Sequence, residues 1–118
     1  MKRHSHRELD GKIRKAREAV QRSLLLILEP AVLASDALEL GFDIQDIPEI
    51  LLDFLDNVSP RNYIGQHPPE RSYKDQITDC ELFAFQCFSR YLGCNVYLKF
   101  ALEGEHLWVV SLHEPKKR

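Results

Sequence analysis

The chain has 118 residues, of which 44% are hydrophobic and 29% are charged, and its formal net charge is −2. These values are typical of one ordinary globular domain, and no apolar run approaches the roughly 20 residues of a membrane-spanning helix. We therefore expect a single domain over residues 1–118, with mobile tails at 1–5 and 115–118 and no membrane partner.

Cysteine content and charge distribution narrow the class of protein further. Three cysteines without a CxxC pair do not make a disulfide framework, and the basic N-terminus has no apolar segment behind it, so a cytoplasmic protein is predicted. Residues 1–22 carry a net charge of +5, whereas residues 23–60 carry −8 and no Lys or Arg. The total charge therefore does not indicate a general nucleic-acid binder, although the basic chain ends could form a local patch.

The first 57 residues predict three helices. The spacing of Ser5 and Glu8 is that of a capping box, and apolar residues then recur every three or four positions, which predicts a helix over residues 6–28. Pro30 and Gly41 bracket a second helix over 31–40. A second capping-box pattern, from Asp46 to Glu49, begins a third helix over 46–57.

The segment from residue 59 to 78 is predicted to be a loop because it contains three prolines and a glycine. Long loops in compact domains are usually functional or disordered. Aromatic and basic side chains are interleaved here, which favours a functional role. The side chains expected to bind substrate are Arg61, Tyr63, His67 and Lys74.

The remainder of the chain predicts a β-meander. Residues 80–92 are expected to form a strand, and two apolar strands joined at Gly104 fill residues 95–115. A strand from the preceding loop would extend the edge. The predicted fold is thus α+β, with three N-terminal helices packed on one face of a C-terminal antiparallel meander.

Polar side chains on these strands suggest a site. Tyr97 and Lys99 share one face of their strand, Gln86 and Arg90 share a parity on the preceding strand, and the closing strand ends in His113. Histidine can transfer protons near neutral pH, cations can stabilise a charged phosphate, and tyrosine can bind a phosphate or stack on a base. This set suits RNA cleavage by the substrate's own 2′-hydroxyl. The alternative is a solvated sheet face that carries scattered polar residues.

Other chemistry has less support in the sequence. No HxxxH, HExxH or CxxC motif is present, so no metal site is predicted. Glycine-rich phosphate loops are absent, so no nucleotide or other cofactor is expected. The three cysteines lack the context of a nucleophile and are expected to be buried or half-buried thiols.

Three phrases in order resemble the MqsR-type toxins, RelE-like ribonucleases of bacterial toxin–antitoxin modules. They are ALELGFD at residues 37–43, VYLKF at 96–100 and LWVVSLHE at 107–114. The resemblance covers roughly residues 33–114, with an intervening segment about ten residues longer than in the family. It implies a RelE-like α+β fold, mRNA cleavage without a metal or cofactor, and neutralisation by a cognate antitoxin protein.

The resemblance also assigns residues. Tyr97 lies on a catalytic tyrosine of the family, Gln86 corresponds to its glutamine, and His113 stands where the family has a catalytic lysine. A second family lysine, in a Phe-Tyr-Lys triplet, is replaced here by the segment 62–64, so Arg61, His67 or Lys74 would substitute for it.

These observations predict an endoribonuclease. In it, His113 is the general acid or base, Tyr97 positions the phosphate, Gln86 completes the catalytic set, and Lys99 or Arg90 stabilises the developing charge. Arg90 joins the loop residues in the expected substrate-binding set. A catalytically inactive RelE-fold interaction module and a small RNA-binding domain are the alternatives, and a homodimer is compatible with each.

Overall fold

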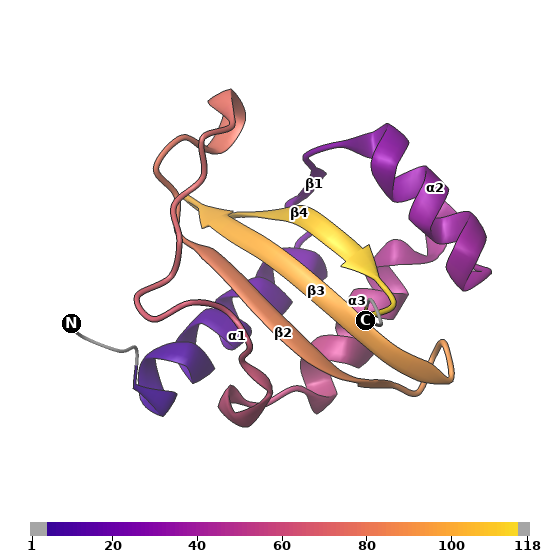
Figure 1. Cartoon of the computed structure of the whole chain (residues 1–118), viewed down its shortest axis with the longest axis horizontal. Helices are drawn as coiled ribbons and strands as arrows, with labels where there is room; N and C mark the ends of the chain where they lie inside the picture. Colours follow the sequence, from indigo (N-terminus) through magenta and orange to yellow (C-terminus); the bar gives the residue numbers. More distant parts are fainter. Residues whose placement is uncertain (1–4, 116–118) are drawn as a thin grey trace.

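The computed structural model describes residues 5–115 and has an α+β architecture, in which helices cover one face of a four-stranded sheet (Figure 1). The predicted α+β class is therefore confirmed. The predicted tails lie outside the described residues, apart from Ser5 and Pro115.

The three helices are α1 (His6–Gln21), α2 (Pro30–Leu40) and α3 (Ile47–Asn57). Ser5 caps α1 in the predicted capping box, since its hydroxyl accepts from the Glu8 N–H and the Glu8 carboxylate accepts from the Ser5 N–H, each at 3.1 Å. Gly41 ends α2 in the left-handed conformation at φ 79°. The capping box predicted for α3 does not form, because Asp46 makes no side-chain cap.

The end of the first predicted helix is a strand. After α1 stops at Gln21, Ser23 turns the backbone at φ 60°, and β1 (Leu25–Ile27) runs parallel to β4. The prediction of a helix to residue 28 was wrong because residues 24–28 are all apolar, a pattern that suits a buried strand as well as a helix. The sheet is consequently mixed, not purely antiparallel.

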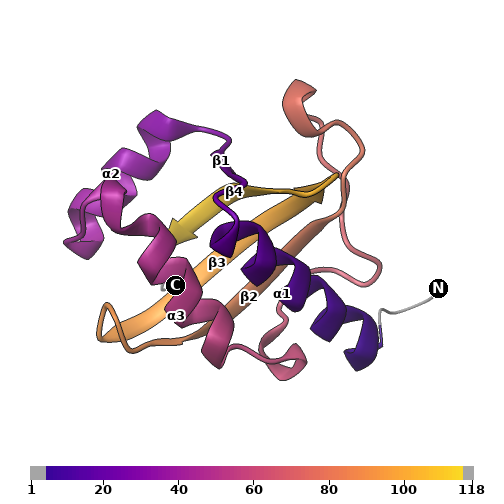
Figure 2. The same cartoon turned by 180° about the vertical axis from the view of Figure 1, so that it is seen from behind.

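The antiparallel part of the sheet matches the predicted meander. It consists of β2 (Leu82–Ser89), β3 (Cys94–Glu103) and β4 (His106–His113), and the strand order across the sheet is β1-β4-β3-β2. Helices α1 and α3 lie against one face of it (Figure 2). The largest side chains buried on that face are Phe54, Phe83, Phe85 and Phe100.

The loop between α3 and β2 follows the outer edge of β2. It contains the short helical turns η2 (Pro60–Asn62) and η3 (Asp75–Ile77). The extra edge strand that we predicted is reduced to two isolated bridges, Tyr63 to Phe85 and Arg71 to Glu81. Ile77 packs with Leu28 and Ala101 in a small second core, which closes one end of the sheet face opposite α1 and α3.

Candidate active site on the open face of the sheet

The sheet face that points away from α1 and α3 carries three of the predicted catalytic residues, Gln86, Tyr97 and His113, in one row. We call it the open face; its accessible part is lined by Gln86, Tyr97, Lys99, Ser111 and His113. The register pairs Gln86 with Tyr97 and Tyr97 with His113, so these residues lie side by side on three adjacent strands. The Tyr97 and His113 rings stack with centroids 5.0 Å apart and an interplanar angle of 19°.

A β-bulge in β4 places His113 on this face. Phe100 pairs with Val109 and Lys99 pairs with Ser111, so Val110 is an extra residue in the ladder. Val109 is buried against the helices, and strict alternation would send Ser111 and His113 to the same side. The bulge reverses the alternation: Leu112 is buried instead, and His113 stacks on Tyr97.

The hydrogen bond of His113 assigns its tautomer. Nδ1 lies 2.7 Å from the backbone carbonyl oxygen of Glu114, and a carbonyl oxygen can only accept. We therefore assign the proton to Nδ1, which leaves a lone pair on Nε2 of the neutral ring. Nε2 is the atom of His113 that can accept a proton from a substrate hydroxyl.

Lys99 lies one step along β3 from this row and is held by the loop. Its Nζ donates to the Glu70 carboxylate at 3.0 Å, and the Lys99 side chain is 23% exposed. Burial lowers the pKa of Lys99, but hydrogen bonds to Glu70 and Tyr97 and their charges outweigh that effect, so its pKa is raised. Lys99 is thus a fixed ammonium cation beside Tyr97.

Residues missed by sequence reasoning complete the hollow over this row, which has a volume of about 410 Å³. Ser111 pairs with Lys99 and lines the floor, and Ile64 lines the side next to β2. Glu70 reaches Lys99 from a position 29 residues earlier in the chain. The i, i+2 spacing of Ser111 and His113 could have revealed Ser111; nothing in the local sequence indicates Glu70.

Two residues of the predicted set are directed elsewhere. Strand β2 ends at Ser89, so its alternation does not extend to Arg90, whose Nε lies 3.8 Å from the Asp53 carboxylate of α3. Arg90 therefore does not join Gln86 on the open face. Lys74 lies in the loop before η3 and pairs with Glu29 at 3.5 Å.

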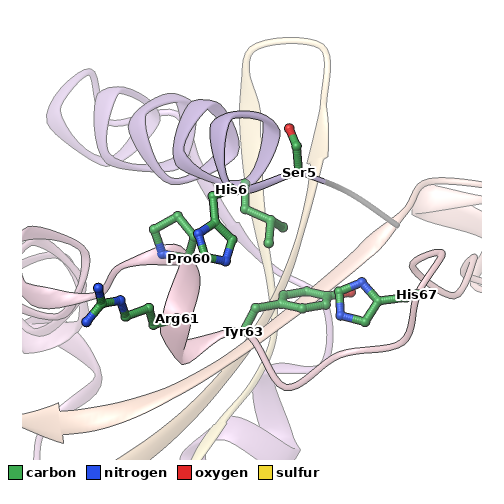
Figure 3. Close-up of a pocket in the computed structure, with 7 residues that line it drawn as sticks. Ser5, His6, Pro60, Arg61, Tyr63 and His67 are labelled. Carbon is green, nitrogen blue, oxygen red and sulfur yellow. The ribbon is translucent and has the colours of Figure 1, made fainter. Parts of the chain in front are cut away.

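The remaining loop residues form a different hollow beside the start of α1 (Figure 3). There the rings of Tyr63 and His67 meet edge to face, with centroids 4.8 Å apart, and His6 points toward them from α1. Arg61 lies at the rim and extends the other way. The predicted substrate-binding residues of the loop are therefore not gathered around His113.

The described residues give little support for a metal site or for a reactive thiol. Within residues 5–115, no three His, Cys, Asp or Glu side chains are grouped as metal ligands. The three cysteines are free and half-buried, and burial raises the pKa of each thiol. No helix among these residues is long and apolar enough to cross a membrane.

Comparison with known proteins gives no family for this chain. Neither a protein-family model nor a curated protein sequence matches it.

Proposed function

We propose that the protein is an endoribonuclease that cleaves mRNA without a metal ion, as the toxin of a toxin–antitoxin module. The observation that carries this proposal is the row of Gln86, Tyr97 and His113 across three strands, with the ammonium of Lys99 beside it. The order of the three sequence phrases that resemble those of MqsR-type toxins supports the same function. An RNA substrate, a neutralising antitoxin protein and a cytoplasmic location belong to this proposal.

In the proposed reaction, Nε2 of His113 accepts the proton of a ribose 2′-hydroxyl. The 2′-oxygen then forms a bond to the adjacent phosphorus while the bond from phosphorus to the 5′-oxygen breaks, and water protonates the departing oxygen. The products are a 2′,3′-cyclic phosphate and a 5′-hydroxyl. Lys99, the Tyr97 hydroxyl and the Gln86 amide donate hydrogen bonds to the phosphate oxygens as negative charge develops on them.

The distribution of charge is compatible with RNA on the open face. The eight acidic residues between positions 23 and 60 belong to α2, α3 and the segments that flank them. Since α3 packs against the opposite face of the sheet (Figure 2), much of this charge lies away from the row. Much of the negative charge that would repel a polyanion is thus not on the face that carries Lys99.

Cleavage of RNA by the purified chain in EDTA tests the proposal. His113→Ala should reduce the rate by about 100-fold or more, the range typical for loss of a general base. The matched control is His106→Ala, which removes the histidine at the other end of β4. Equal rates for the parent and His113→Ala, or loss of cleavage in His106→Ala alone, would contradict the assignment. In cells, His113→Ala should abolish growth arrest that His106→Ala retains.

A second candidate function is a non-catalytic module that binds a protein partner or RNA. The ion pair favours it, because Glu70 already neutralises Lys99 and no other Lys or Arg lines the described hollow. The same EDTA experiment separates the two, since only the enzyme generates fragments with 2′,3′-cyclic phosphate ends. Salt-dependent RNA affinity without fragments would indicate the RNA-binding form of this module.

A further inference from the structure

An exposed aromatic side chain lies directly beside the proposed catalytic row. Phe83 and Phe85 of β2 are buried against the helices at 2% and 0% exposure, whereas Phe88 is 54% exposed. Alternation along the strand places Phe88 on the open face with Gln86. At this exposure Phe88 gains little of the stabilisation that burial of a phenylalanine ring gives to a fold.

The register puts a hydrogen-bonding side chain opposite this ring. Phe88 pairs with Asn95 of β3, in the row next to that of Gln86, Tyr97 and His113. Adjacent same-face positions on a strand are about 7 Å apart. Asn95 is exposed, and its amide offers both a donor and an acceptor.

The shape of the open face favours a bound RNA strand that runs from the Tyr97 row toward Phe88. At the other end, Ile77 and Leu28 cover Ala101, and Glu70 reaches across to Lys99. Among residues 5–115, by contrast, Phe88 and Asn95 are left exposed, so a polymer whose phosphate lies on the Tyr97 row can place its next residue at the Phe88 end. Exposed aromatic rings bind single-stranded nucleic acids by base stacking, with or without sequence preference.

We propose that Phe88 and Asn95 form a nucleobase subsite, in which the base next to the scissile phosphate stacks on Phe88 and its edge hydrogen-bonds to the Asn95 amide. This inference rests on the proposed ribonuclease function and identifies its substrate as unpaired RNA with a splayed base. Phe88 supplies affinity for any base, while Asn95 supplies preference, since an amide distinguishes the donors and acceptors of the base edges.

Binding of 2′-O-methyl RNA oligonucleotides tests the subsite, because these probes lack the attacking hydroxyl and cannot be cleaved. Fluorescence anisotropy should show that Phe88→Ala weakens binding at least about fivefold, the lower end of the range for loss of one stacked base. Phe88→Tyr keeps the ring and should bind within twofold of the parent. The matched control is Tyr91→Ala, which removes an aromatic ring, 46% exposed, from the turn after β2.

Asn95→Ala tests the base preference, which is measured as the affinity for A, C and U homo-oligomers of 2′-O-methyl RNA. In Asn95→Ala, the ratio of the affinities for the best-bound and the worst-bound oligomer should fall. In Phe88→Ala, the affinity for each of the three oligomers should fall. If the ratios of these affinities in Asn95→Ala equal those of the parent, Asn95 is not part of the subsite.

The outcomes separate this inference from the proposed function. Unchanged RNA affinity in Phe88→Ala, in a protein that cleaves RNA, overturns the subsite and leaves the ribonuclease standing. Weakened affinity in a protein that binds but does not cleave supports the subsite and overturns the ribonuclease. No RNA binding by the parent overturns both. If sedimentation instead shows that Phe88→Ala loses self-association while RNA affinity is unchanged, Phe88 belongs to an interface between copies and the subsite is wrong.

Discussion

Replacement of Glu70 by glutamine should strengthen RNA binding while it weakens the fold. The carboxylate lies 3.0 Å from Lys99 Nζ, so a phosphate that also contacts Nζ would lie within about 6 Å of it. Two unit charges at that distance in water repel by about 0.7 kcal/mol, so Glu70→Gln should raise RNA affinity about threefold. The half-exposed ion pair contributes at most about 1 kcal/mol, so the melting temperature should fall by a few degrees.

The matched control is Glu105→Gln. Glu105 immediately precedes β4, at the end of the strand opposite His113, and pairs with Arg22 at 2.8 Å. It should change stability by no more than Glu70→Gln does and leave RNA affinity unchanged. Anisotropy with 2′-O-methyl RNA at 50 and 200 mM salt measures the effect, which should shrink at the higher salt. Equal or weaker RNA binding by Glu70→Gln would show that the phosphate does not lie at Lys99.

The ion pair between Lys99 and Glu70 also predicts how the stability of the fold depends on pH. The pKa of Lys99 is raised above the ordinary lysine value of 10.5 in the folded protein. A raised folded pKa contributes stability that is complete below the unfolded pKa and is lost as the pH rises through the folded value. The difference in unfolding free energy between the parent and Glu70→Gln should thus be constant from pH 7 to 9 and shrink above about pH 10.5.

Three further predictions concern the fold. Leu112→Ala should lower the free energy of unfolding in urea by about 2–5 kcal/mol because Leu112 is fully buried, whereas Leu38→Ala, at an 84% exposed site, should change it by less than about 0.5 kcal/mol. Cys87 should react with iodoacetamide at pH 7.5 more slowly than glutathione and faster as the pH rises, since burial, and then the charge of Asp53, raise its pKa. Gly104→Ala should lower the free energy of unfolding by about 1–2 kcal/mol, and with it the melting temperature, because the φ of +60° at Gly104 is unfavourable for a residue with a Cβ atom.

Local patterns predicted most of the elements, and they failed where two structures share one pattern. Helix α2 and its glycine cap were predicted to within a residue, and the three strands of the meander were found in order. Strand β1 was missed because Leu25 and its neighbours continue the apolar stripe of α1, and only pairing with β4 makes them a strand. Tertiary pairing of this kind has no signal within the segment itself.

The candidate site shows the same division at the level of single residues. Alternation correctly put Tyr97 and Lys99 together, but it could not place Glu70, which meets Lys99 through the path of an irregular loop. Arg90 was assigned to the wrong surface because the extent of β2 was overestimated by a few residues at its end. Positions near strand ends are therefore the least safe to assign to a face.

The position of His113 depends on a feature that alternation alone cannot supply. In an unbroken strand, the burial of Leu107 and Val109 would turn His113 toward the helices, and its imidazole would be buried in an apolar core. The extra residue Val110 is accommodated because its apolar side chain packs against the second small core on the open face. The loop that covers this core thus supports the bulge, and the bulge in turn orients His113 onto Tyr97. The geometry of the candidate site at the C-terminal end of β4 is in this way set by hydrophobic packing around Val110, earlier in the same strand.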